Sequence, residues 1–515
     1  MKSNKIMKIA FVGSLILVFI VACEKKLNLV DTNSPTQESY FKTAVELEKG
    51  VNGAYSIIRS TNLLGRAWHY FHSMRGGEVG SGGSQLEVEN NELLTKANPG
   101  VTNAQVNNIW TACYQMINRA NLVIAKGPGV TDNVSLRDRV VGEAKFLRAW
   151  AYYELVSQWG DVPMYTEPVT SPSDFKGKEP SANIYTLILS DLADAAAKLP
   201  ASYSGADLGR ATKGAANALA GRANMQKGDY AAAKTALLAV VNSNLYSLQT
   251  VPFLWNFDGD VKTGSTSVTA GHEFNQESVF EVVFVDKGDN GFGWGGENTS
   301  STAAGSTVRA QDWGTTWGNV VPSTSLLEEF GPDPVADPRY KWTFWEEGDM
   351  VLTKGGTQTG VPLTDFTNGT STKFGVVKKR IFRKYSLNDW VSVAGIVTSG
   401  LNYRLIRYAD VLLMLAECEV EVGTLAQAAT YINMVRSRPG VAMPNIATPA
   451  TKNDGIKAVM HERAVELGGE CIDNVDIIRW RKKGYFPSVK ADPRPGQVNE
   501  LPIPLTETSR NPLIK

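Results

Sequence analysis

Residues 216–242, ANALAGRANMQKGDYAAAKTALLAVVN, and residues 412–437, LLMLAECEVEVGTLAQAATYINMVRS, share one pattern. Each stretch contains a helix rich in small residues, a turn with a glycine (Gly228 or Gly423) and a second alanine-rich helix. Alanine lets two helices approach closely, and helix–turn–helix units of this kind are typical of tetratricopeptide-like pairs. The sequence therefore predicts a mainly α fold with such pairs, degenerate and interrupted rather than arranged as a long regular solenoid.

Further amphipathic helices are predicted before and after these pairs, because apolar residues recur at three- and four-residue steps. Thr36 is available to cap the first of them. Gly160 and Pro163 are expected to end the third, since neither residue continues a helix well. The predicted helices cover residues 37–60, 110–121, 140–159, 184–199, 456–468 and 472–483.

The pattern changes between residues 251 and 400. Glu277–Val285 is rich in β-branched and aromatic residues and is predicted to form a strand. A glycine-rich run, Gly288–Gly296, follows it and cannot form a regular helix. We therefore expect an N-terminal helical part (36–250), an irregular lobe of loops and short strands (251–400) and a C-terminal helical part (401–515), with 36–515 forming one compact unit.

The composition excludes several classes of protein. The chain has 515 residues, of which 43% are hydrophobic, and this is enough for a large core. It carries 52 basic and 52 acidic residues, so it lacks the excess positive charge that nucleic-acid binding requires. Four cysteines are too few for a disulfide scaffold. We predict no nucleic-acid partner and no cofactor.

The N-terminus has the layout of a secretory signal. Three lysines within residues 1–8 precede an apolar run, Ile9–Ala22, which is too short to span a membrane. Ile20–Cys23 resembles the lipobox of bacterial lipoproteins, and this resemblance implies that Cys23 becomes the first mature residue and carries the lipid. An ordinary signal with an incidental cysteine is the alternative. We predict a signal peptide (1–22), a lipidated tether (23–35) and attachment to the membrane through acyl chains alone.

Aromatic residues outside the helical patterns offer a way to bind sugars. Sugar rings present C–H faces that match the face of a tryptophan, and polar neighbours can then bond the hydroxyl groups. Core packing is the alternative for each tryptophan, and it is weakest for Trp294, which has glycines on both sides. The predicted glycan-binding residues are Trp68, Tyr70, Arg75, Trp294, Asn298, Asp312, Trp313 and Trp317. The tryptophans predicted to lie in the core are Trp110, Trp150, Trp159 and Trp480.

Enzyme motifs receive little support from the sequence. His69 and His72 could share one face of a helix, but they lack a third ligand and a zincin-type glutamate, so no metal site is predicted. Gly291–Gly296 is similar to the glycine-rich loop of a nucleotide-binding site. No helix is predicted after it, so there is no helix N-terminus that could bind a phosphate. The Gly-x-Ser-x-Gly motif of hydrolases does not occur. A glycosidase needs two carboxylates about 5 to 10 Å apart, which a sequence does not exclude.

Ordered blocks along the chain resemble the RagB/SusD family of outer-membrane lipoproteins from Bacteroidetes. One departure is the run Gly469-Glu470-Cys471-Ile472-Asp473, where Gly-Glu-Gly-x-Arg is common, and it puts a local salt bridge in doubt. The chain also ends at Lys515, where relatives usually continue for a few residues. The similar blocks are Glu48–Ser56 (EKGVNGAYS), Glu143–Met164 (EAKFLRAWAYYELVSQWGDVPM), Ile184–Pro200, Gly209–Lys213, Gly228–Tyr230, Asn275–Val282, Asp337–Arg339, Arg404–Glu417 (RLIRYADVLLMLAE), Asn433–Arg438, Glu462–Leu467, Arg479–Trp480 and Leu501–Pro504.

The resemblance implies a mostly helical fold, with four tetratricopeptide-like pairs on one side and an irregular lobe on the other. It also implies a role at the cell surface, where such proteins bind an oligosaccharide or polysaccharide. They sit as a lid on a SusC-like TonB-dependent transporter, with the helical side on the barrel, and pass the ligand inward uncut. Two alternatives are a surface glycosidase and a helical-repeat scaffold without a sugar ligand.

Overall fold

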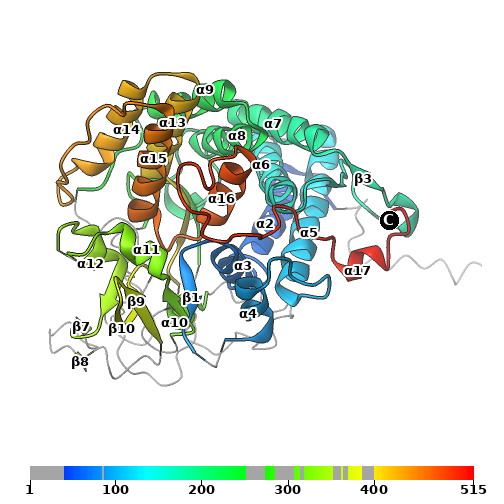
Figure 1. Cartoon of the computed structure of the whole chain (residues 1–515). Coiled ribbons are helices and arrows are strands. Elements are labelled where there is room, and N and C mark those ends of the chain that lie inside the picture. The colour runs from blue at the N-terminus through cyan, green and yellow to red at the C-terminus, as the bar shows by residue number, and fades with distance from the viewer. Residues whose placement is uncertain are drawn as a thin grey trace, which may run out of the picture.

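A computed structural model describes residues 40–83, 86–250, 273–284, 307–313, 318–333, 335–351, 361–362, 369–385 and 400–514. These residues form a mainly helical protein, with most of the short strands gathered along one side of the helices (Figure 1). The prediction of a mainly α fold with tetratricopeptide-like pairs is confirmed. Cys23 and the predicted signal and tether lie outside the described residues.

The N-terminal half packs around one central helix, α6 (Val134–Trp159), which contacts α2, α5, α7 and α8. Every residue from Phe146 to Trp159 is buried, as expected for a helix in the interior. The helix ends at Gly160, which has a positive φ of 69°, as predicted. The other helices of this half are α2 (Ala44–Ile58), α3 (Ala67–Arg75), α4 (Val88–Thr95), α5 (Ala104–Lys126), α7 (Ser181–Lys198), α8 (Lys213–Lys227) and α9 (Tyr230–Val241).

The cap of α2 differs from the prediction. Thr43, and not Thr36, precedes the helix, and its side chain accepts a hydrogen bond from the Glu46 backbone N–H. The Glu46 side chain accepts one in return from the Thr43 N–H, which completes a capping box. The apolar periodicity extended the predicted helix too far toward the N-terminus because the pattern carries no information about where the backbone turns.

Both predicted helix pairs are present, as α8 with α9 and as α13 (Tyr408–Val422) with α14 (Leu425–Arg436). In the first pair, Gly228 ends α8 in a left-handed conformation with φ of 90°. A Cβ atom added at Gly221 would lie 2.5 Å from the Leu237 side chain, so α8 and α9 approach closely only because residue 221 has no side chain. The remaining C-terminal helices are α15 (Lys452–Leu467), α16 (Asp473–Lys482) and α17 (Leu505–Thr508).

The strands are short, and all described pairs are antiparallel. The predicted strand 277–285 is β4 (Ser278–Val282), which pairs with β11 (Tyr403–Arg407) directly before α13. This pair connects the irregular lobe to the C-terminal helices. The other elements are β1 (Val79–Ser81) with β5 (Val320–Pro322), β10 (Val376–Phe382) between β6 (Phe344–Glu346) and β9 (Thr370–Lys373), β2 (Val162–Pro163) with β3 (Lys178–Glu179), β7 (Met350–Val351) with β8 (Val361–Pro362), and the short helices α10 (Arg309–Trp313), α11 (Thr324–Glu329) and α12 (Arg339–Thr343).

A buried network of charges joins the lobe to the C-terminal helices. We call it the arginine cluster; its members are Arg339, Arg407, Arg438, Lys384, Glu277, Glu462, Glu466 and Glu470. Arg407 on β11 lies at its centre, 2.7 Å from both Glu277 and Glu466. Glu470 pairs with Arg407 at 2.8 Å and with Lys384 at 2.9 Å. Glu470, which the altered run at 469–473 retains, therefore has two cationic partners.

Among the residues that the structure describes, no helix combines the length and the apolar character that crossing a membrane demands.

Candidate functional site

Two segments that carry five of the predicted glycan-binding residues, Trp68, Tyr70, Arg75, Asp312 and Trp313, meet in the structure. Strand β1 pairs with β5, so that Gly80 lies opposite Val321. On either side of this pair, the Gly82 N–H donates to the Asn319 carbonyl at 2.9 Å and the Val308 N–H donates to the Gly65 carbonyl at 3.3 Å. We call the joined segments, 65–82 with 307–313 and 318–323, the seam. Segments more than 200 residues apart in sequence are thus held side by side by backbone hydrogen bonds.

Helix α3 forms one half of the seam and is buried along its whole length. Trp68 is 2% exposed, and its indole N–H donates to Glu154 of α6 at 3.0 Å. His72 Nε2 bonds the same carboxylate oxygen at 2.9 Å, and the Trp68 and His72 rings lie 4.4 Å apart. These contacts and the Tyr403 ring, 5.5 Å away, leave the indole no open face.

His69 and His72 do not form a metal site in the described part of the chain. His69 Nε2 lies 2.8 Å from the Leu64 carbonyl, and its Nδ1 lies 3.1 Å from Arg309. Burial, together with the charge of Arg309, holds the pKa of His69 well below its usual value, so the ring is neutral. The described residues contain no group of three or more His, Cys, Asp or Glu side chains placed to hold a metal ion.

Tyr70 and Arg75 also point into the protein, and both are fully buried. The Arg66 guanidinium lies 5.2 Å from the centre of the Tyr70 ring. Arg75 donates to the Val498 carbonyl at 3.1 Å, which connects α3 to the C-terminal segment. Burial lowers the pKa of Arg75 to about 9. Neither side chain offers a surface to a ligand.

Asp312 and Trp313 form the other half of the seam. Asp312 accepts a hydrogen bond from Arg66 Nε at 3.1 Å. Burial raises the pKa of this carboxyl even though Arg66 acts in the opposite direction. Trp313 is 2% exposed; its ring lies 5.4 Å from that of Phe382, and the Arg309 guanidinium lies 4.7 Å from the indole.

The burial of these side chains corrects the predicted glycan contacts. A sugar stacks on an open aromatic face or bonds an accessible polar group, and Trp68, Tyr70, Arg75, Asp312 and Trp313 present neither. Their part is to hold the seam together. Trp294, Asn298 and Trp317 lie outside the described residues, and their glycan contacts stay predictions. The predicted core tryptophans are confirmed as buried: Trp110, Trp150, Trp159 and Trp480.

A stack beneath the seam was not predicted from the sequence. The Arg309 guanidinium lies 4.1 Å from the centre of the Tyr385 ring and 5.2 Å from that of Tyr403. Tyr403 in turn contacts Trp68, with ring centres 5.5 Å apart. These residues come from three distant parts of the chain, so no periodic pattern could have linked them. They give the seam a rigid base, because the Tyr385 and Tyr403 rings stack on one another with centres 5.0 Å apart and the guanidinium lies against them.

An open groove of about 490 Å³ lies away from the seam, between α5 and α17. Its aromatic wall contains Tyr114 and Tyr165, with ring centres 5.9 Å apart at an angle of 83°. Asn118 and Arg510 are exposed at its edges. Rings beside amide and guanidinium groups suit a sugar in principle. Sequence reasoning missed this groove because α17 and α5 are almost 400 residues apart.

Comparisons with known proteins agree with this architecture. Residues 276–515 match the family model described as the SusD family, and residues 83–225 match one described as starch-binding associating with outer membrane. SusD-like protein P25 of Formosa agariphila is 26% identical, with 97% of each chain covered. Among solved structures, a laminarin-binding SusD-like protein superposes with a TM-score of 0.70 at 23% identity, covering 92% of this chain and 99% of the other. Surface glycan-binding protein A from Bacteroides uniformis superposes with a TM-score of 0.70 at 19% identity, with the same coverage.

Proposed function

Because the chain belongs to the SusD/RagB family, we propose that it captures oligosaccharides or polysaccharides at the cell surface and delivers them to a SusC-like TonB-dependent transporter in the outer membrane. The observation that carries this proposal is the likeness to family members over almost the whole chain, including proteins named for binding laminarin and surface glycans. The protein is anchored by lipid on Cys23 and faces the cell exterior.

The seam supports a binding site in the segments next to it. Trp294, Asn298 and Trp317 are the predicted contacts, and Trp317 directly precedes Gly318, the first described residue before β5. Binding residues are often positioned by a rigid scaffold. In this proposal the buried ion pairs and rings of the seam are the scaffold, and Trp294, Asn298 and Trp317 contact the sugar.

Capture by stacking and hydrogen bonding leaves the glycosidic bonds intact. A ring face and a few polar groups hold a sugar reversibly, so the ligand can pass on to the transporter. Cleavage would require one carboxyl group to protonate the leaving oxygen and a second to act as nucleophile or base across the sugar. We assign no catalytic residue.

A binding panel tests this function. The form beginning at Glu24 is run through affinity gels containing plant, microbial or host polysaccharides, and new reducing ends are measured in the same samples. Retention without new reducing ends is the expected result. New reducing ends would show that the protein is a glycosidase. If the protein is not retained and no new ends form, the helical-repeat scaffold is favoured. Asn118→Ala and Arg510→Ala in the groove serve as controls. Loss of retention in these variants would show that the glycan binds in the groove and not at the predicted contacts.

Replacing Cys23 with alanine is expected to release the protein from membranes. The lipid bonds only to a cysteine, and each buried CH₂ of an acyl chain contributes about 0.8 kcal/mol to membrane attachment. Fractionation of cells that express either form measures the result. Cys113→Ala is the matched control, because Cys113 is buried in α5 and its loss leaves the anchor unchanged. Membrane retention of the Cys23→Ala form would contradict the anchor.

A further inference from the structure

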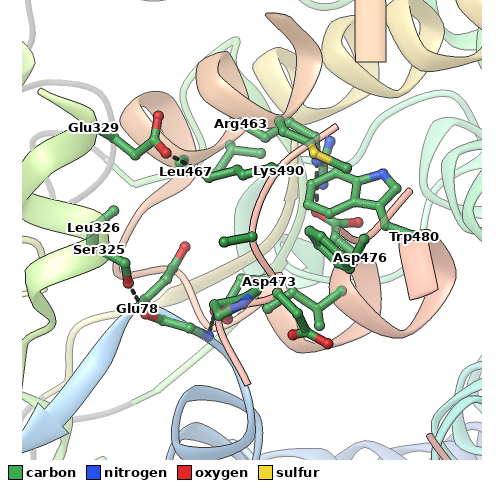
Figure 2. Close-up of a pocket in the computed structure, with 18 of the residues that line it drawn as sticks. Glu78, Ser325, Leu326, Glu329, Arg463, Leu467, Asp473, Asp476, Trp480 and Lys490 are labelled. Carbon is green, nitrogen blue, oxygen red and sulfur yellow. Dashed lines mark hydrogen bonds and ion pairs between the residues drawn. The ribbon is translucent and has the colours of Figure 1, made fainter. Parts of the chain in front are cut away.

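A cavity of about 290 Å³ lies beside the seam, between α11, α15, α16 and residues 486–493 (Figure 2). Glu78 and Asp473 bring two carboxyl groups to one end of it. A space of this size suits a small organic molecule rather than a chain of sugars. The rest of the wall is largely apolar, and its larger members are Leu326, Met460, Leu467, Ile477, Trp480 and Phe486.

Most charged groups around this cavity are neutralised by partners within the protein. Three carboxylates at its rim and wall each pair with a basic side chain of the protein. Their charge is therefore already compensated without a ligand. Glu329 pairs with Lys490 and also with His461 at 2.7 Å, and the nitrogen-to-oxygen distances of Asp476–Arg463 and Asp492–Arg481 are both 2.7 Å.

Glu78 and Asp473 differ from these groups. Glu78 is 6% exposed and accepts a hydrogen bond from the Gly469 N–H at 2.8 Å. Asp473 accepts one from the Gly77 N–H at 2.6 Å, and its other oxygen is buried without a hydrogen-bond partner. Within the described residues, neither carboxyl has a cationic side chain within 4.0 Å.

Asp473 is the first residue of α16, and it places a second carboxyl in the wall of the cavity that Glu78 also lines. Two carboxyls in an apolar surrounding lack a counter-charge, and a cation from outside the protein can provide it.

We propose that this cavity binds a small organic cation, a primary ammonium group on a compact apolar body. The ammonium donates hydrogen bonds to Glu78 and Asp473, which accept strongly when ionised. The body packs against Trp480, Phe486 and the aliphatic wall, where removal of apolar surface from water favours binding. An anion would be repelled by the two carboxyls. A polyol would make hydrogen bonds but would not pack against the apolar wall. This inference is independent of glycan capture.

Protonation of the two carboxyls gives the site a pH dependence. Burial, followed by the charge of Asp473, raises the pKa of Glu78 well above its usual value, and burial raises the pKa of Asp473 to about 7. The Asp473 carboxyl therefore holds a proton at pH 6, and a bound cation favours the ionised form of both carboxyls. Binding is expected to release protons, and affinity is expected to rise from pH 6 to pH 8. The charged groups that act on the pair from neighbouring elements are Lys384, Glu470, Asp476 and Arg494.

Titration calorimetry of the full chain in detergent tests the proposal with three probes. Benzylammonium carries the charge and the apolar body, benzyl alcohol lacks the charge, and glucosaminium carries the charge on a hydroxylated ring. We expect one benzylammonium site, at least tenfold tighter than either other probe, with proton release that is measured by comparing two buffers. Equal binding of benzyl alcohol, tighter binding of glucosaminium, or no saturable binding of benzylammonium would overturn the proposal.

Variants locate the bound cation. Glu78→Gln and Asp473→Asn keep the size of each side chain and are expected to weaken benzylammonium binding at least tenfold. Ala464→Phe is expected to fill the cavity and abolish binding. Glu500→Gln is the matched control, because Glu500 is exposed and lies outside the cavity lining. Unchanged affinity in folded Glu78→Gln and Ala464→Phe proteins would place the ligand elsewhere; if a variant fails to fold, the three-probe comparison on the unaltered chain still decides.

Discussion

Replacing Arg407 with methionine is expected to lower the free energy of unfolding by about 3–5 kcal/mol, the largest effect among the substitutions considered. Arg407 has a side chain that is 1% exposed and donates to Glu277, Glu466 and Glu470 at 2.7 to 2.9 Å. Methionine keeps much of the volume but leaves three buried carboxylates with one fewer guanidinium.

The local electrostatics explain why the loss is large. The surrounding arginines hold the pKa of Glu466 below its usual value, so this carboxylate stays ionised in the folded protein. Arg438 and Arg339 still contact Glu466 in the variant, at 3.1 Å in the case of Arg339. Arg438 donates to Glu277 only at 3.4 Å, and Lys384 donates to Glu470 at 2.9 Å. Neither replaces the hydrogen bonds that Arg407 made to these carboxylates, which lie too deep for water to supply the lost donor.

Urea unfolding of both forms measures this effect. Lys96→Met serves as the matched control, because Lys96 pairs with Glu92 on the surface of α4 and its side chain is 61% exposed. An exposed pair of this kind contributes about 0.3–0.5 kcal/mol. A change below about 1 kcal/mol for Arg407→Met would mean that the arginine cluster contributes little to stability.

The second large effect separates two tryptophans that the sequence placed in one predicted site. Trp313→Ala is expected to lower the free energy of unfolding by about 3–5 kcal/mol, because it leaves a cavity beside Phe382 and Arg309. Trp294→Ala is expected to leave the unfolding midpoint unchanged and to weaken glycan retention about tenfold, equivalent to ~1.4 kcal/mol. The two measurements are urea unfolding and affinity electrophoresis on the same preparations.

The control for truncation of an aromatic ring is Phe374→Ala, since Phe374 lies in the β9–β10 turn and is 50% exposed. Its unfolding midpoint is expected to stay close to that of the unaltered chain. If Trp313→Ala binds glycan poorly at an unchanged midpoint, Trp313 is a ligand contact and its burial does not define its role. If Trp294→Ala binds normally, the predicted platform at Trp294 is wrong.

The helices could be predicted because their signal is local. A helix repeats every 3.6 residues, so apolar positions three and four apart reveal one buried face within a short window. The pattern located α7, α15 and α16 within a few residues but predicted only the middle of α5, and Gly160 and Gly228 marked two helix ends correctly. The cap at Thr43 was missed, since capping depends on backbone angles that apolar spacing does not report.

The blocks that resemble the family have a structural meaning that the sequence did not reveal. Arg339, Arg407, Arg438 and the block Glu462–Leu467 stood out in separate short motifs, and the fold brings them together in the arginine cluster. Asp337 pairs with Arg339 at the side of this cluster. A buried charge needs its partners at hydrogen-bond distance, so each motif depends on the others. These motifs therefore indicate the fold of the chain rather than its ligand.

The sequence by itself determined the helical class, the family and the general chemistry expected at a glycan site. Only the tertiary structure decided which aromatic residues of the seam are buried, and that Glu78 and Asp473 share one cavity. The physical reason is that periodicity acts within a few turns of one helix, whereas burial depends on segments that are hundreds of residues apart. Glu154 and Tyr403 contact the Trp68 ring and bury it. Both are far from Trp68 in the sequence, so no local spacing could indicate these contacts.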